Sequence, residues 1–136
     1  MDKLEKITHF IQEHHVLNLA THHNDEISVC SLFYVYDAKA KVFIVASSSD
    51  TKHIEHIMHN ASVAGNILLE TDTIGKIQGL QFLANFHKLK DTSLEASYFK
   101  AFPYALALLP TLWKVEVNSF KFTDNRLGFG KKLIWP

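Results

Sequence analysis

Residues 41–60, KVFIVASSSDTKHIEHIMHN, join a strand, a run of hydroxyl residues and a helix start without a break. Val42–Ala46 is an apolar, largely β-branched run of strand length. Three serines follow at positions 47–49, and Asp50 is a favourable N-cap for an amphipathic helix over Thr51–His59. The stretch therefore predicts a strand that leads through hydroxyl side chains directly into a helix.

Two interpretations of this junction fit its residues equally well. Free N–H groups at a helix start, serine hydroxyls and the ammonium of Lys52 together can hold a phosphate without a metal. Alternatively, the serines only cap the helix, which is the usual role of such residues. The residues of the junction leave both interpretations open.

Composition narrows the class of protein. The chain has 136 residues, 47% of them hydrophobic, and a formal net charge of zero, so we expect a single domain over 1–136 and no nucleic-acid partner. No apolar run is long enough to span a membrane, and the N-terminus does not resemble a secretory signal. The single cysteine, Cys30, fits a reducing compartment, so we expect a cytoplasmic protein without a membrane partner.

Outside the 41–60 stretch, alternating apolar patterns predict a mainly β protein. An N-terminal helix over 2–15 precedes a hairpin, and a tail over 123–136 ends the chain. The expected strands are Val16–Ala20, Ile27–Tyr36, Val42–Ala46, Ser62–Leu69, Ile74–Leu89 and Leu112–Val117, the last resuming through Phe122. Short helices are expected over 94–102 and 104–109. About six strands joined mostly by short turns predict a small antiparallel barrel with added helices, in which Gly75 and Gly79 mark places for a bulge.

The second strand of the hairpin is apolar on both faces. One face carries Val29, Ser31, Phe33 and Val35, and the other carries Cys30, Leu32, Tyr34 and Tyr36. This pattern is expected where one face packs into a barrel interior and the other meets a helix or another subunit.

No residue qualifies as a catalytic group or a metal ligand. His53, His56 and His59 recur every third residue, and without a carboxylate at a ligand position we expect them on a solvated helix face. Cys30 lies among apolar neighbours, which predicts a buried structural thiol. The tail segment GFGKK at 128–132 lacks the Ser or Thr and the following helix of a phosphate-binding P-loop, so we expect no nucleotide triphosphatase.

The order of these motifs resembles a known superfamily. The hairpin LNLATHH and ISVCSLFYVYD, the strand KVFIVASS, the helix start Thr51–Lys52 and the stretch HNASVAG resemble the pyridoxamine 5'-phosphate oxidase-like FMN-binding split barrels. The segment GLQF at 79–82 and the tail FTDNRLGFGKKLIW are similar to the YhbP-type branch of that superfamily.

The resemblance implies a six-stranded split barrel that forms a homodimer, with FMN in clefts at the subunit interface. It implies that the FMN phosphate is held by the hydroxyls and the lysine of the 41–60 stretch, namely Ser47, Ser48, Thr51 and Lys52. The backbone around Ser31, Leu32 and Phe33 would lie along the isoalloxazine ring, and Gln81 is a weaker candidate for a ring or ribitol contact.

The chain also departs from the oxidase itself. The oxidase carries an Arg and a Lys in the second strand, where this chain has Val29 and Tyr34. The C-terminal Arg–His signature is replaced by the segment Asn125–Gly128. We therefore expect a flavin-dependent oxidoreductase whose small-molecule substrate is unknown, and not an oxidase of pyridoxamine phosphate.

Two alternatives come from other classes of function. The cleft could take haem or another ligand, for which the histidines would serve as ligands. The chain could also be a non-catalytic dimeric scaffold with a degenerate cleft, because the missing cations weaken a phosphate site.

Overall fold

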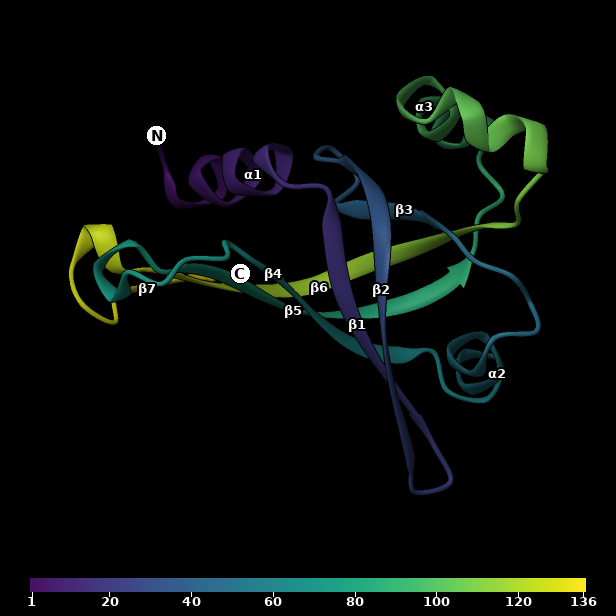
Figure 1. Cartoon of the computed structure of the whole chain (residues 1–136), viewed down its shortest axis with the longest axis horizontal. Coiled ribbons are helices and arrows are strands. Elements are labelled where there is room, and N and C mark those ends of the chain that lie inside the picture. The colour runs from purple at the N-terminus through teal and green to yellow at the C-terminus, as the bar shows by residue number, and fades with distance from the viewer.

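The computed structural model describes all residues 1–136 and consists of one antiparallel sheet with helices at its edges (Figure 1). The helices are α1 (Lys3–Glu13), α2 (Lys52–His59) and α3 (Thr92–Ala101), with three short 3₁₀ helices, η1 (Ile74–Lys76), η2 (Pro103–Leu108) and η3 (Asn125–Leu127). The strands are β1 (Val16–His23), β2 (Glu26–Asp37), β3 (Val42–Ala46), β4 (Ser62–Leu68), β5 (Gln78–Lys88), β6 (Leu112–Asp124) and β7 (Lys132–Trp135).

The sheet closes on itself. Its strand order is β3-β2-β1-β4-β5-β6-β7, and an additional pairing joins β3 to β6. Every residue of β3 pairs with β6, from Val42 opposite Glu116 to Ala46 opposite Leu112. The strands β1 to β6 therefore form the expected six-stranded barrel, and β7 is a short addition at the free side of β6.

Aromatic side chains fill the barrel interior. The ring centroid of Phe43, in the shortest barrel strand, lies 5.0 Å from that of Phe82 and 4.9 Å from that of Tyr36. Helix α1 adds Phe10, whose ring centroid lies 4.9 Å from that of Phe122. The hydroxyl of Tyr34 donates to the carbonyl of Ile11 at 2.6 Å, which ties α1 to the hairpin by a buried polar contact.

The two faces of β2 separate as its sequence predicts. Tyr34 is buried, and Cys30, Leu32 and Tyr36 pack against the core from half-buried positions. On the outer face, Ile27, Val29 and Phe33 are 81%, 73% and 59% exposed. A strip of large apolar side chains on the outside of the barrel is therefore left uncovered.

Several element boundaries differ from the sequence-based expectation. Ile74–Lys76 is a 3₁₀ helix, so β5 begins only at Gln78. The sequence pattern predicts no strand in the tail, but Lys132–Trp135 forms β7. The bulge lies between Leu83 and Ala84, where Asn118 of β6 is left unpaired, and not at Gly75 or Gly79.

None of the helices combines the length and apolar character that crossing a bilayer requires.

Gly65 of β4 is the glycine with the least space for a side chain. A Cβ at this position would lie 2.2 Å from Cζ of Phe82 and 2.7 Å from the carbonyl oxygen of Asn18. We expect Gly65→Ala to lower the free energy of unfolding by about 1–3 kcal/mol through overpacking. Chemical denaturation measures this loss, and Gly75→Ala, where no atom lies within 4 Å of the added Cβ, is the matched control. Equal stability of the two variants would contradict this packing.

Candidate functional site

The junction between β3 and α2 is fixed by backbone contacts to β6. The N–H of Ser47 donates to the carbonyl of Thr111 at 3.1 Å. The indole N–H of Trp113 donates to the carbonyl of Ser47 at 3.0 Å. Because both polar groups of the Ser47 backbone are paired with residues at the start of β6 or directly before it, the start of α2 has a defined position beside the barrel rim.

The first turn of α2 keeps its N–H groups free. The N-cap is Thr51 and not Asp50 as expected, and no side chain caps the helix. By contrast, Asp2 caps α1 and Asp91 caps α3. The first backbone bond of α2 runs from the N–H of Glu55 to the carbonyl of Thr51. No serine side chain caps α2, and the N–H groups of residues 52–54 have no backbone partner.

The hydroxyl groups of the junction are already engaged within the chain. Ser47 Oγ lies 2.5 Å from Nε2 of His53, and Thr51 Oγ1 donates to the carbonyl of Ser48 at 2.8 Å. Ser48 Oγ donates to the carboxylate of Asp50. If His53 carries its proton on Nε2, it donates to Ser47 Oγ and leaves the serine hydroxyl proton free for a ligand.

Lys52 supplies the positive charge of the junction, but it has acidic neighbours. Its Nζ lies 3.4 Å from the carboxylate of Glu26 and 3.7 Å from that of Glu55. Both carboxylates and the ammonium are at least half exposed, so these ion pairs are weak and exchange readily with an incoming anion. The site therefore combines several neutral donors with one partly compensated cation.

The expectation of a solvated histidine face on α2 is wrong for two of the three residues. His53 and His56 are buried at 8% and 1% exposure, and only His59 is exposed. Nδ1 of His56 lies 2.9 Å from the hydroxyl of Thr21 in β1, whereas its Nε2 has no hydrogen-bond partner. These two histidines lie on the barrel side of the helix, because the amphipathic pattern of α2 turns them inward together with Ile54 and Ile57.

The remaining candidate residues lie away from this junction. Leu32 points toward the barrel core, and the ring of Phe33 lies 6.0 Å from that of Phe102 on the outer face. Ser31 and Gln81 are exposed on the outer face of the sheet. The structure therefore brings Ser47, Ser48, Thr51 and Lys52 together, and it places Ser31 and Gln81 elsewhere on the barrel.

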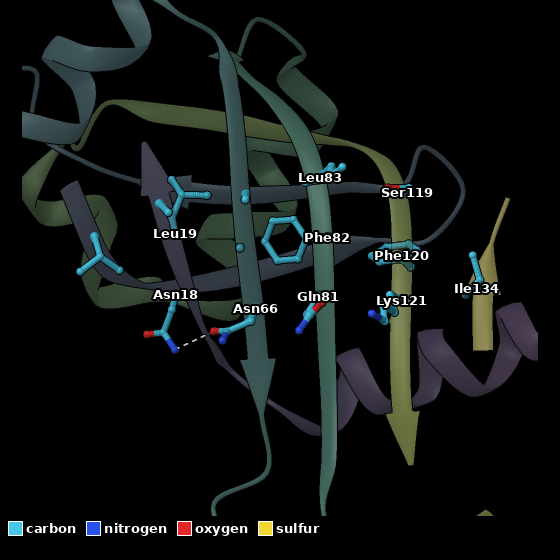
Figure 2. Close-up of a pocket in the computed structure, with 14 residues that line it drawn as sticks. Asn18, Leu19, Asn66, Gln81, Phe82, Leu83, Ser119, Phe120, Lys121 and Ile134 are labelled. Carbon is cyan, nitrogen blue, oxygen red and sulfur yellow. Dashed lines mark hydrogen bonds between the residues drawn. The ribbon is translucent and has the colours of Figure 1, made fainter. Parts of the chain in front are cut away.

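A groove on the outer face of the barrel contains Gln81. Its volume is about 510 Å³, a usual size for a small-molecule site, and residues of β1, β2, β4, β5, β6 and β7 line it (Figure 2). A second hollow of about 530 Å³ shares Ala20, Ala64 and Leu83 with the groove and reaches Glu26, the partner of Lys52. The groove and the start of α2 are thus connected along the surface.

Sequence reasoning missed four polar residues of the groove: Asn18, Asn66, Ser119 and Lys121. Each is a polar residue at an outward position of an alternating strand, which gives a weak signal by itself. Their proximity follows from strand register, which the sequence does not specify.

Comparison with known proteins places the chain among curated relatives of similar length. No family model matches the chain. It is 36% identical over 138 residues to a UPF0306 protein of Enterobacter sp. strain 638, covering 99% of this chain and 97% of the relative. It is 33% identical to the UPF0306 protein YhbP of Salmonella paratyphi A, covering 99% of this chain and 94% of the relative.

Solved structures at low sequence identity share the fold. A haem-binding protein from Mycobacterium smegmatis has a TM-score of 0.81 at 12% identity, covering 99% of this chain and 58% of that protein. A FAD-binding protein from Mesorhizobium loti has a TM-score of 0.72 at 15% identity, covering 87% and 91%. A protein named as a candidate pyridoxamine 5'-phosphate oxidase, from Listeria innocua, has a TM-score of 0.73 at 14% identity, covering 89% and 98%. The fold is thus a split barrel of the pyridoxamine 5'-phosphate oxidase-like type.

The environment of His53 makes a pH dependence of stability testable. Burial and the neighbouring His56 lower the pKa of His53, because both disfavour the imidazolium form. The unfolded chain takes up this proton near pH 6.5 and the folded chain at lower pH, so stability falls as the pH decreases below about 6.5. We expect His53→Gln to lose less thermal stability between pH 7.5 and 5.5 than the wild type, as measured by melting temperature.

The control for this measurement is His87→Gln, a change at an exposed position of β5. It should keep the wild-type pH dependence. An equal change of melting temperature with pH in the His53 and His87 variants would show that His53 does not contribute.

Proposed function

The chain belongs to the UPF0306 family, and from this premise we propose that it is an FMN-binding split-barrel protein acting as a flavin-dependent oxidoreductase. The observation that carries the proposal is the start of α2, where the N–H groups of residues 52–54 have no partner and Lys52 lies beside them. Free N–H groups and the positive end of a helix favour an anion such as a phosphate. The FAD-binding protein from Mesorhizobium loti, which shares the fold, supports the choice of a flavin.

FMN would supply the redox chemistry, and the chain would position it. The phosphate would lie against residues 52–54, with Ser47, Ser48, Thr51 and Lys52 around it. The backbone of Ser31, Leu32 and Phe33 would lie along the ring, and Gln81 would be a contact at its far edge. The donors fit a phosphate, but the charge is low, so we expect binding in the micromolar range and not the tighter binding of a site rich in Arg and Lys.

Titration of the flavin-free protein with FMN, followed by fluorescence quenching, tests the phosphate site. We expect Lys52→Ala to weaken FMN binding about tenfold, because a charge-assisted contact is lost. Glu26→Gln should tighten binding about threefold, because it frees Lys52 from an exposed ion pair. Lys39→Ala, at an exposed position of the β2–β3 turn, is the control for a general charge effect. Unchanged affinity in the Lys52 variant would remove the proposed site.

A homodimer follows from the uncovered apolar strip of β2. This strip consists of Ile27, Val29 and Phe33. Leu83 of β5, which is 58% exposed, lies on the same outer face of the sheet. Apolar side chains of this size and exposure in a contiguous strip are typical of a protein interface. Packing of two such strips would also cover the groove from above and place the proposed flavin between subunits.

The mass of the protein in solution tests the homodimer. We expect the wild type to have twice the chain mass of 15.5 kDa in light scattering, and the double variant Ile27→Glu, Val29→Glu to have the single mass. Charges introduced at these exposed positions oppose association without altering the core. Met58→Glu on α2, which is 70% exposed outside the strip, should stay dimeric. A wild type of single-chain mass would rule out the dimer.

Haem is the second candidate, because a haem-binding protein shares the fold. The histidines nearest the junction argue against it. Nε2 of His22 lies 2.9 Å from the amide of Asn60, Nε2 of His53 is bonded to Ser47, and His56 is buried against Thr21. If addition of haem produces a Soret band, and substitution of one histidine removes that band, haem and not FMN would be the favoured ligand.

A further inference from the structure

A row of polar side chains crosses the outer face of the barrel, and all of it except Ser31 lines the groove. Ser31 pairs with Asn18, Asn18 with Asn66, Asn66 with Gln81, and Gln81 with Lys121. Directly paired residues on neighbouring antiparallel strands point to the same face of the sheet. Figure 2 shows the side chains of Asn18, Asn66, Gln81 and Lys121 in one line across four strands.

One half of this row is already hydrogen-bonded and sets its orientation. Ser31 Oγ donates to Oδ1 of Asn18 at 2.8 Å. Nδ2 of Asn18 in turn donates to Oδ1 of Asn66 at 2.9 Å (Figure 2). The carbonyl oxygen of the Asn66 side chain is thereby occupied. Its amide N–H groups are left as donors toward the groove.

The other half of the row has no partner within the chain. Neither the carboxamide of Gln81 nor the ammonium of Lys121 takes part in a side-chain hydrogen bond, and Lys121 is absent from the five ion pairs. No Asp or Glu is among the residues that line the groove. The groove therefore carries one uncompensated positive charge beside neutral donors, unlike the start of α2, where two carboxylates surround Lys52.

The floor of the groove beside the row is apolar and smooth. Ala20 and Ala64 present only methyl groups, and Gly65 has no side chain because the ring of Phe82 fills the space beneath it. Such a floor accepts the face of a planar ring, while the polar row meets its edge. Asn66 and Lys121 are separated by two strand spacings, about 10 Å, which suits a single ring that bears a charged substituent.

We propose that this groove binds a planar, acceptor-rich anion, namely a heterocycle with ring carbonyls and a carboxylate. Lys121 contacts the carboxylate, and Asn66 and Gln81 donate to the ring carbonyls. Two observations carry the assignment: the unpaired donors in register, and the absence of any acidic side chain in the groove. The site shares Gln81 with the proposed contact to the flavin ring, but its cation, Lys121, lies outside the proposed flavin phosphate site at α2.

Calorimetric titration of the flavin-free protein with orotate tests this site, with uracil as the uncharged counterpart. We expect orotate to bind saturably and uracil at least tenfold more weakly, because only orotate has a carboxylate for Lys121. Lys121→Gln should weaken orotate binding about tenfold and leave uracil unaffected, whereas Gln81→Leu should weaken both. Both residues are exposed, and circular dichroism verifies that the variants are folded.

Two control variants distinguish the effect of Lys121 from that of other lysines. Lys132→Gln, an exposed lysine of β7, and Lys52→Ala should both bind orotate as the wild type does. Absence of saturable orotate binding, an unchanged affinity in Lys121→Gln, or a loss of orotate affinity in Lys52→Ala would each overturn the proposal. Failure of FMN to bind leaves these results unaffected, so the two proposals are tested separately.

Discussion

The pairing of β3 with β6 is the constraint on which the rest of the structure depends. Val42–Ala46 has only five residues, yet it pairs with β2 on one side and with β6 on the other. Its first four residues are buried, which suits a strand covered on both faces. This strand closes the barrel, and its end fixes where the chain leaves the rim, so the position of Ser47 and of α2 follows from the closure. A shift of this short strand would move the candidate anion site as a whole.

The side chains of α2 hold the helix against the barrel through polar contacts as well as apolar ones. Ile54 and Ile57 are buried, but His53 reaches back to Ser47 and His56 reaches Thr21. Buried polar groups need partners, so these contacts specify one orientation of the helix more narrowly than apolar packing alone. The free N–H groups at the helix start are consequently held in a defined place. An anion that binds there meets a preorganised set of donors, which lowers the cost of ordering them.

Some of this arrangement could be predicted from the sequence. The boundaries of Val42–Ala46 are those observed, because a continuous apolar run flanked by turn residues and hydroxyls has few alternatives. β7 was missed because four residues with two lysines carry too little periodicity, and only the neighbouring β6 makes them a strand. The spacing of the three histidines does not by itself predict that His53 and His56 are buried. The neighbouring apolar residues, Ile54 and Ile57, determine which face of α2 is buried. The register that aligns Asn18, Asn66 and Lys121 depends on tertiary pairing, which local patterns do not encode.

The two candidate sites differ in how their charge is balanced, and this difference indicates different ligands. At α2 the donors are backbone groups, and the lysine is shared with carboxylates, so affinity depends mainly on neutral hydrogen bonds. In the groove the donors are side chains on rigid strands, and the charge of Lys121 is not shared. A cation without a counterion beside an apolar floor gains more from an anion than a solvated ion pair does, because less water and no competing carboxylate must be displaced. The proposed site at the rim would thus accept anions broadly, and the proposed site on the outer face would be more selective.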